Sequence, residues 1–392
     1  DSEIKWQKSR YTVIINYMRV LFLSHYCGLL GSNRSLDSLI THFIDKGEEV
    51  TILLPSRGEF YQHLSRLGRD VHSFMFIYET LYVKENKKYL TLPLLWVYNF
   101  FAFPLLLYKI KKINPDIIYT NSSSDLYSVF IAKLLGKKHV MHVREFMQED
   151  FGGYCIFGRK VKRCIVLKSD KLVFVSEAVA KAVVGMVPEY GKVIYNGLPA
   201  PKAEYGFYGI NNHLRIGLVG NIDISKQQDL AIKMMPAILE KYPQATLHLI
   251  GDKECPYKKY IKGLVKKLNI EENVIFEGFV KDVEDIYSKF DILLMCSRSE
   301  AFGRVTIEAM LRCKPVIGYD VGGTSELIED RVTGFKFKTC DDVIAALNII
   351  INERYLTKKI VENAKEEALR KFAEPTYTKK VYDFIMKEAW RT

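Results

Sequence analysis

Short apolar runs alternate along the chain with longer stretches in which apolar residues recur every three or four positions. Runs such as Arg19–Ser24 and Glu49–Leu54 are apolar on both faces, which is typical of strands buried in a parallel sheet. Stretches such as Ser35–Asp45 and Leu126–Leu135 have the helical period. This alternation predicts βα units around parallel sheets. Further strands of the first half are expected over Asp116–Thr120, Lys138–Val143 and Lys171–Val175.

The same alternation starts again after an interruption. Leu198-Pro199-Ala200-Pro201 and a polar segment as far as Asn212 have the composition of a linker. Strands are then expected over Leu214–Gly220, Ala245–Gly251, Val274–Phe276, Asp291–Met295 and Pro315–Tyr319, with helices from Gln228 and over Lys258–Leu268.

An α/β architecture follows, with two Rossmann-like domains facing a central cleft, because ligands of open parallel sheets bind at the carboxyl ends of the strands. A length of 392 residues suits two domains. The expected division is a non-native or flexible lead-in over 1–17, one domain over 18–198, a second over 199–375, and a C-terminal helix over 376–392 that packs back on the first domain.

One segment breaks the pattern. Tyr89–Ile110 is strongly apolar and aromatic, and lysines flank it on both sides. Pro93, Asn99 and Pro104 make it a poor membrane-spanning helix. It is either a buried helix that precedes the next strand or an interfacial helix that contacts a membrane, and the aromatics and lysines favour the second.

Composition and charge narrow the class of partner. A chain that is 48% hydrophobic and 26% charged is globular, and its 57 Lys+Arg against 46 Asp+Glu give a net charge of +11. Such an excess suits nucleic acid, an anionic membrane or a phosphate-bearing substrate. No basic stripe with interleaved aromatics is present, so nucleic acid is not expected. A basic run is either a solvated helix face or a contact with anionic lipid: Arg159, Lys160, Lys162, Arg163, Lys168 and Lys171.

The seven cysteines contain no CxxC pair. This spacing predicts reduced thiols in a cytoplasmic protein, without a disulfide framework or zinc cluster.

The strongest chemical signal is the segment Ser297–Met310. A strand ends, a Ser-rich loop follows, and a helix begins near Gly303, so that Glu300 and Glu308 bracket the turn. Glycine lets the backbone approach a ligand, a helix N-terminus attracts phosphate, and a carboxylate can accept from two neighbouring hydroxyls of a sugar. On spacing alone, the alternative is that Glu300 caps the helix and Glu308 is an ordinary helical residue.

A second turn has the same form. The strand Pro315–Tyr319 leads into Gly322-Gly323 and a helix that opens at Thr324. Backbone amides exposed at such a turn favour a phosphate or a hydroxyl-rich ligand.

Together, Glu300-x7-Glu308 and the Gly-Gly turn resemble the donor site of the retaining GT-B glycosyltransferases of family 4, also called group 1. The match is dense from about Gly217 to Phe335 and lighter before that. The resemblance implies a GT-B fold with an acceptor-binding first domain and a donor-binding second domain. It implies transfer of a sugar, with retention, from a nucleotide-diphosphate donor, which is expected to be UDP- or GDP-linked. The basic run beside the apolar segment leads to the hypothesis of a glycan or lipid-linked acceptor in cell-surface polysaccharide synthesis.

The resemblance also assigns residues. It implies that Lys226 grips the donor diphosphate, with Asn221 standing where arginine is common, that Glu300 binds donor sugar hydroxyls and that Glu308 binds ribose. His142 matches the position over the transferred sugar and makes up the catalytic set with Glu300 and Lys226. The donor-binding set is Gly31, Gly220, Asn221, Lys226, Glu300, Ala301, Phe302, Gly303, Glu308, Gly322 and Gly323.

On the acceptor side the resemblance places Arg144 and Glu145, which are expected to pair with each other. Phe174–Glu177 and Asn196-Gly197 also match the pattern and are expected to have structural or hinge roles.

No metal ion or other cofactor is expected. The resemblance implies metal-independent catalysis, in which Lys226 and helix dipoles neutralise the leaving phosphate and that phosphate itself takes the acceptor proton. Two alternatives remain: a GT-B nucleotide-sugar epimerase, which needs no acceptor, and a non-catalytic carbohydrate-binding protein, which predicts loss of the site carboxylates. The expected location is cytoplasmic, peripheral on the inner face of the cell membrane and in contact with anionic lipid.

Overall fold

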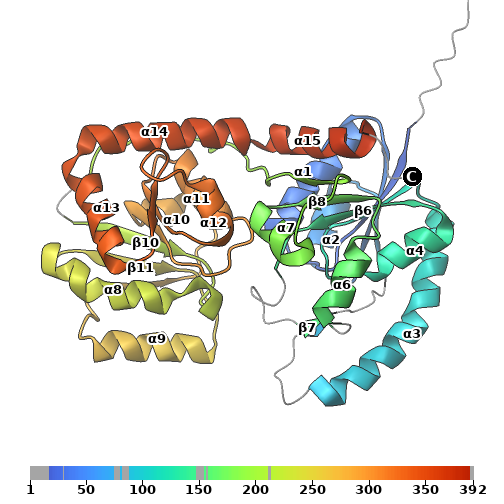
Figure 1. Ribbon diagram of the computed structural model, residues 1–392, viewed down its shortest axis with the longest axis horizontal. Helices are drawn as coiled ribbons and strands as arrows, with labels where there is room; N and C mark the ends of the chain where they lie inside the picture. The colour runs from blue at the N-terminus through green and yellow to red at the C-terminus, as the bar shows by residue number, and fades with distance from the viewer. Residues whose placement is uncertain are drawn as a thin grey trace, which may run out of the picture.

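Two parallel β-sheets, each covered by helices on both faces, make up the body of the molecule (Figure 1). The computed structural model describes residues 17–29, 31–74, 80–81, 88–146, 154–155, 158–210 and 213–388. The first sheet has the strand order β3-β2-β1-β5-β6-β8-β9 and the second β12-β11-β10-β13-β14-β15. The expectation for residues 1–17 lies almost entirely outside the described residues.

The strands are β1 (Arg19–Leu23), β2 (Glu49–Leu54), β3 (Val71–Ser73), β4 (Thr80–Leu81), β5 (Ile117–Thr120), β6 (Lys138–Val143), β7 (Tyr154–Cys155), β8 (Lys171–Phe174), β9 (Gly191–Val193), β10 (Arg215–Val219), β11 (Thr246–Ile250), β12 (Val274–Gly278), β13 (Ile292–Met295), β14 (Val316–Tyr319) and β15 (Phe335–Phe337).

The helices are α1 (Gly31–Asp45), α2 (Glu59–Arg66), α3 (Lys88–Ile113), α4 (Tyr127–Leu135), α6 (Gly158–Val166), α7 (Glu177–Val184), the 3-10 turn η2 (Ile224–Lys226), α8 (Gln228–Lys241), α9 (Pro256–Lys267), α10 (Val283–Ser288), α11 (Arg304–Leu311), α12 (Gly322–Leu327), α13 (Cys340–Asn352), α14 (Arg354–Lys371) and α15 (Glu374–Met386).

Burial on both faces explains why the central strands lack polar alternation. Every residue of β5 and of β13 is buried, because helices cover both sides of each sheet. Each of the ten predicted strands is present to within two residues at either end. The short edge strands β3, β9 and β15 were not predicted, since three residues carry too little pattern.

The C-terminal helices tie the two halves together. In Figure 1, α14 runs along the second domain and α15 continues across the first, where it packs against α1. The chain crosses between the two domains twice, near Leu198 and near Ala373, and the two crossing segments are hydrogen-bonded to each other. Leu198 N donates to the Phe372 carbonyl at 2.8 Å, and Glu374 N donates to the Leu198 carbonyl at 3.1 Å. The exact domain boundaries stay a prediction.

The basic run of the first domain has two kinds of member. Arg159, Lys160, Arg163 and Lys168 are exposed, as a solvated or lipid-facing role requires. Lys162 and Lys171 are buried, at 5% and 1% exposure, so the expectation was wrong for these two. The Lys171 ammonium donates to the Phe384 carbonyl and, at 2.8 Å, to the Glu388 carbonyl at the end of α15. It stabilises that helix end.

The apolar segment forms α3, which Figure 1 shows at the periphery of the first domain. One face packs on the sheet, through residues such as Ala102, Leu106 and Ile110, each at most 1% exposed. The opposite face is exposed, with Phe100 at 75% and Phe101 at 63%. The helix is therefore not wholly buried. No helix in the described part of the chain is long and apolar enough to cross a bilayer.

Candidate active site at the strand ends

The centre of the site is an ion pair between the two predicted catalytic residues of the second domain. The Lys226 ammonium lies 2.5 Å from Glu300 Oε2, and the two side chains are only 27% and 16% exposed. Lys226 ends the turn that follows β10, and Glu300 lies in the loop that follows β13, a neighbouring strand. The pair forms because carboxyl ends of adjacent parallel strands meet at one edge of the sheet. Glu300 does not cap α11, so the simpler alternative for this residue is wrong.

The Gly-Gly turn packs directly against the Glu300 backbone. Gly323 N donates to the Glu300 carbonyl at 2.7 Å. A Cβ on Gly323 would lie 2.7 Å from the Glu300 oxygen and 2.8 Å from that of Ala301, and Gly322 has a φ of +57°. Both positions therefore need glycine, one for close approach and one for left-handed backbone. The turn fixes the loop that carries Glu300.

A third glycine sets the direction of α11. Gly303 precedes the helix with φ +91° and ψ +53°, and a Cβ there would meet the Glu300 side chain at 3.3 Å. Glu308, one turn into α11, accepts from the Tyr287 hydroxyl at 3.0 Å. The Tyr287 hydroxyl is buried, and burial together with the Glu308 carboxylate holds its pKa well above the ordinary value, so that it remains a donor.

Three further predicted donor residues, all within the described part of the chain, make no side-chain hydrogen bond to the Lys226–Glu300 pair. Asn221 is exposed and contributes its backbone carbonyl to the Gln228 amide at 3.0 Å. Gly220 has φ +152°, and the stem of Lys226 passes 3.5 Å from where its Cβ would be. Phe302 is buried against Tyr195 and Phe372, where its ring packs between the two domains. Its side chain therefore supports the loop.

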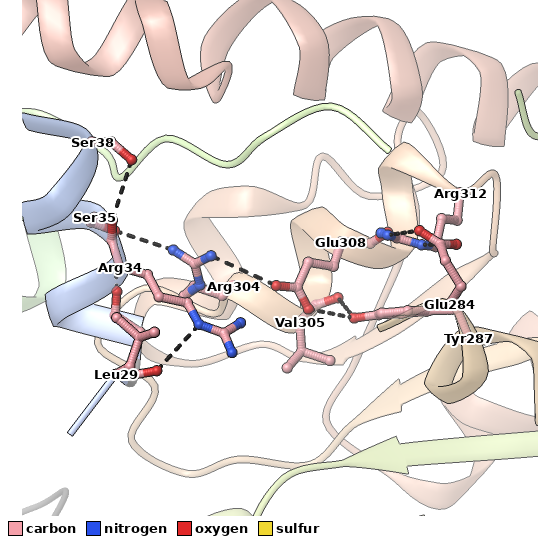
Figure 2. A network of polar contacts seen from close by, with 11 residues as sticks. Leu29, Arg34, Ser35, Ser38, Glu284, Tyr287, Arg304, Val305, Glu308 and Arg312 are labelled. Carbon is pink, nitrogen blue, oxygen red and sulfur yellow. Dashed lines mark hydrogen bonds and ion pairs between the residues drawn. The ribbon is translucent and has the colours of Figure 1, made fainter. Parts of the chain in front are cut away.

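Arg304 connects this site to the first domain, as Figure 2 shows. It is the first residue of α11, and its Nη1 donates to Ser35 Oγ of α1 at 3.1 Å. Its Cδ lies 3.1 Å from the position of a Gly31 Cβ. The predicted glycine of the first domain thus lies against Arg304 of the second domain, and its contact with the donor stays a prediction.

His142 has an environment that the sequence did not suggest. It lies inside β6, and its side chain has no exposed surface. Nδ1 is hydrogen-bonded to the Tyr119 hydroxyl, and burial lowers the pKa well below the ordinary value, so the imidazole is neutral. Direct contact between His142 and a sugar stays a prediction, and its burial does not favour it.

Arg144 and Glu145 do not pair with each other, and that expectation was wrong. Arg144 donates to Asn121 and Asn196, both at 2.6 Å, and to the Tyr377 hydroxyl of α15 at 2.9 Å. Glu145 turns the other way. It accepts from the Ser122 hydroxyl at 2.7 Å and the Ser123 amide at 2.8 Å. Successive residues at a strand end point to opposite faces, which separates the two charges.

Three contributors were missed from the sequence. Tyr287 positions Glu308 by a hydrogen bond, and Arg304 lies 3.8 Å from the same carboxylate. Glu326 bridges the domains by accepting from Ala178 N of α7 at 2.6 Å and from the Tyr195 hydroxyl at 3.1 Å. Arg304 and Glu326 lie within the two motifs already recognised, so their place beside glycine turns was the available signal. Tyr287 gives no local signal, because it reaches Glu308 only through the packing of α10 on α11.

The geometry can bind an anionic, hydroxyl-rich ligand. It combines a cation and a carboxylate with glycine turns that bring the backbone close, at the edge where α/β ligands bind. In the described residues no group of three or more His, Cys, Asp or Glu side chains is arranged to hold a metal ion, and metal independence stays a prediction.

Comparison with known proteins agrees with this architecture. The family described as glycosyl transferases group 1 matches residues 209–367, and glycosyltransferase family 4 matches residues 30–200. The chain belongs to this group of glycosyltransferases and has the GT-B fold, so the predicted family, fold class and enzyme class are confirmed.

Relatives in sequence match over part of their length. An uncharacterized glycosyltransferase of Methanocaldococcus jannaschii is 29% identical over 198 residues, which cover 46% of this chain and 50% of that protein. The N-acetyl-alpha-D-glucosaminyl L-malate synthase of Bacillus anthracis is 31% identical over 173 residues, which cover 44% of each chain. The chain thus spans about half the length of these relatives or less.

The solved structures are similar over nearly the whole chain. HepE of Anabaena in complex with UDP has a TM-score of 0.75 and 22% identity, with 95% of this chain and 100% of that chain covered. The same protein in complex with UDP-glucose has a TM-score of 0.74 and 22% identity, with the same coverage. At this identity the likeness establishes the fold.

Proposed function

We propose that the protein transfers a sugar from a nucleotide-diphosphate donor, UDP- or GDP-linked, to a glycan or lipid-linked acceptor of cell-surface polysaccharide, with retention of configuration. The observation that carries the proposal is the Lys226–Glu300 pair, at 2.5 Å, between two glycine turns. The complexes of HepE, a relative in fold, with UDP and with UDP-glucose support a nucleotide-sugar donor.

The pair has a direct chemical use. A bound diphosphate carries more negative charge than the Glu300 carboxylate. The Lys226 ammonium therefore exchanges its ion pair with Glu300 for an ion pair with the phosphate oxygens. Glu300 is then free to accept from sugar hydroxyls. As the bond to the sugar breaks, Lys226 stabilises the charge that develops on the leaving diphosphate. The departing phosphate oxygen takes the acceptor proton, and the acceptor attacks from the same face.

The donor can be identified by ligand-induced stabilisation. Free UDP-, GDP- and ADP-sugars are added to the full chain, and the thermal unfolding midpoint is measured. A ligand at about 100 times its Kd stabilises the folded state by about 2.7 kcal/mol, so a clear upward shift is expected for UDP- or GDP-sugars. No shift with any of these sugars at millimolar concentration would contradict the proposal.

The same proposal places the protein on an anionic membrane surface, at the cytoplasmic face, through α3. Apolar side chains at helical spacing form its exposed face, the α3 face: Leu94, Val97, Phe101, Leu105 and Tyr108. Phe100 lies beside this face, and the exposed Lys111 and Lys112 lie in the last turn. Exposed apolar surface next to lysines suits insertion among anionic headgroups, to which each lysine contributes about 1 kcal/mol.

Replacing Phe101 and Leu105 together by glutamate is expected to reduce binding to phosphatidylglycerol vesicles at least 10-fold in a sedimentation assay, because both buried apolar area and charge attraction are lost. Both residues are exposed, so the unfolding midpoint should change little. Tyr355→Ser on α14, at 85% exposure, is the matched control. Equal sedimentation of the wild type with neutral and anionic vesicles would contradict the membrane proposal.

A further inference from the structure

Arg304 lies where the beginnings of two helices from different domains meet. It opens α11 of the second domain directly after Gly303, and its side chain crosses to the first turn of α1, where Nη1 donates to Ser35 Oγ at 3.1 Å. Helix N-termini carry partial positive charge and free amides. A guanidinium placed at this point adds a full positive charge to a region that is already positive.

Other arginines increase the excess. Burial lowers the pKa of Arg304, and the charges of Arg34 and Arg144 lower it as well. The Glu308 carboxylate acts in the opposite direction, but the pKa remains below its ordinary value. Figure 2 shows the Arg34 and Arg304 side chains on the same side of the α1 N-terminus. Arg144 is already engaged by three oxygen acceptors, whereas the exposed Arg34 uses Nε to donate to the Leu29 carbonyl at 3.3 Å. This hydrogen bond leaves Nη1 and Nη2 of the Arg34 guanidinium able to donate to a ligand.

The carboxylate opposite Arg304 does not balance this charge. Glu308 Oε1 is 3.8 Å from Arg304 Nη2, too far for a hydrogen bond, and the other oxygen accepts from Tyr287 at 3.0 Å. A partly buried guanidinium with a distant counter-ion favours an additional anion, and the fork geometry of two arginines suits phosphate oxygens.

We propose that Arg304 of the second domain and Arg34 of the first bind the diphosphate of the donor together with Lys226. This inference rests on the proposed function. Its location carries it, because Gly303 joins Arg304 directly to the loop of Glu300, and Glu300 contacts Lys226. One diphosphate then contacts cations from both domains, so donor binding also holds the two domains together.

The experiment is calorimetric titration of the full chain with UDP and with uridine, or with GDP and guanosine if the donor panel selects that base. Arg304→Gln is expected to weaken nucleoside diphosphate binding about 10- to 100-fold, as for loss of a charge-assisted hydrogen bond, and to leave nucleoside binding within about 2-fold. Arg34→Gln should have the same selectivity with a smaller loss. Arg304→Lys should restore part of the affinity. Arg370→Gln, an exposed arginine of α14, is the control.

Three outcomes would overturn the inference. An equal loss of affinity for the nucleoside diphosphate and the nucleoside would mean that Arg304 acts only on the fold. Unchanged diphosphate binding in both Arg304→Gln and Arg34→Gln would show that the two arginines do not bind the diphosphate. Unchanged diphosphate binding with lost binding of glycerol phosphate would assign the anion to an acceptor phosphate. A wild type that binds no nucleoside diphosphate would contradict the proposed function itself, whereas normal wild-type binding with unaffected variants contradicts only the role of the two arginines.

Discussion

Lys226→Ala is expected to reduce kcat/KM for sugar transfer by about 10²- to 10³-fold, the range found when one charge-stabilising donor is removed from an active site. The Lys226 ammonium forms an ion pair of 2.5 Å with Glu300, at the edge where the strands of the second sheet end. Its loss removes stabilisation of the leaving diphosphate. Steady-state kinetics with a saturating acceptor measure the effect.

The fold should survive this change. The pair is partly exposed, so its removal should alter the free energy of unfolding by about 1 kcal/mol or less. Lys233→Ala is the control, because that lysine makes a similar pair with Asp229 at 2.8 Å on the exposed side of α8. Glu300→Gln, which keeps the shape and removes the charge, should lose transfer as well. Near wild-type kinetics in both Lys226→Ala and Glu300→Gln would refute the assignment of the site.

Gly323→Ala is expected to lower both activity and stability, and the reason is backbone contact. The added methyl would lie 2.7 Å from the Glu300 carbonyl oxygen and 2.8 Å from that of Ala301, and neither backbone atom can rotate away. The Glu300 loop must move, which should cost about 1–3 kcal/mol of stability and at least about 10²-fold in kcat/KM. Chemical denaturation and steady-state kinetics on the same preparation measure both quantities.

Gly263→Ala is the matched control. Gly263 lies within α9, and nothing lies within 4 Å of its Cβ position. Alanine there should raise the free energy of unfolding by about 0.5–1 kcal/mol, because glycine is the poorer helix former. If Gly323→Ala proved as harmless as Gly263→Ala, the turn would not fix the Glu300 loop.

The strands could be predicted because their apolar runs are buried on both faces, so each leaves a strong local signal. Glu49–Leu54 and Lys138–Val143 have the predicted bounds. The edge strand Phe335–Phe337 is only three residues long and belongs to the sheet through its partner β14. Its place depends on pairing with distant residues, which no local pattern contains.

Site residues could be predicted from the sequence where each lies in the turn directly after its own strand, as Glu300 does after β13 and Gly323 after β14. It was not predicted where the partner comes from another element. Arg144 was expected to pair with its neighbour in sequence, but its hydrogen bonds go to Asn121, Asn196 and Tyr377, up to 233 positions away. Strand alternation sends adjacent side chains apart, and only the folded chain brings the distant oxygens to the guanidinium.

The paired crossings at Leu198 and Ala373 limit how the two halves can move. A single connecting strand would allow both bending and twisting, but here two strands cross side by side and are joined by hydrogen bonds of 2.8 and 3.1 Å. Two chain segments joined in this way restrict twisting of one domain against the other more than a single segment would. We therefore expect an opening of the two domains to bend the chain at Leu198 and Ala373 and to separate Arg304 from Ser35 of α1.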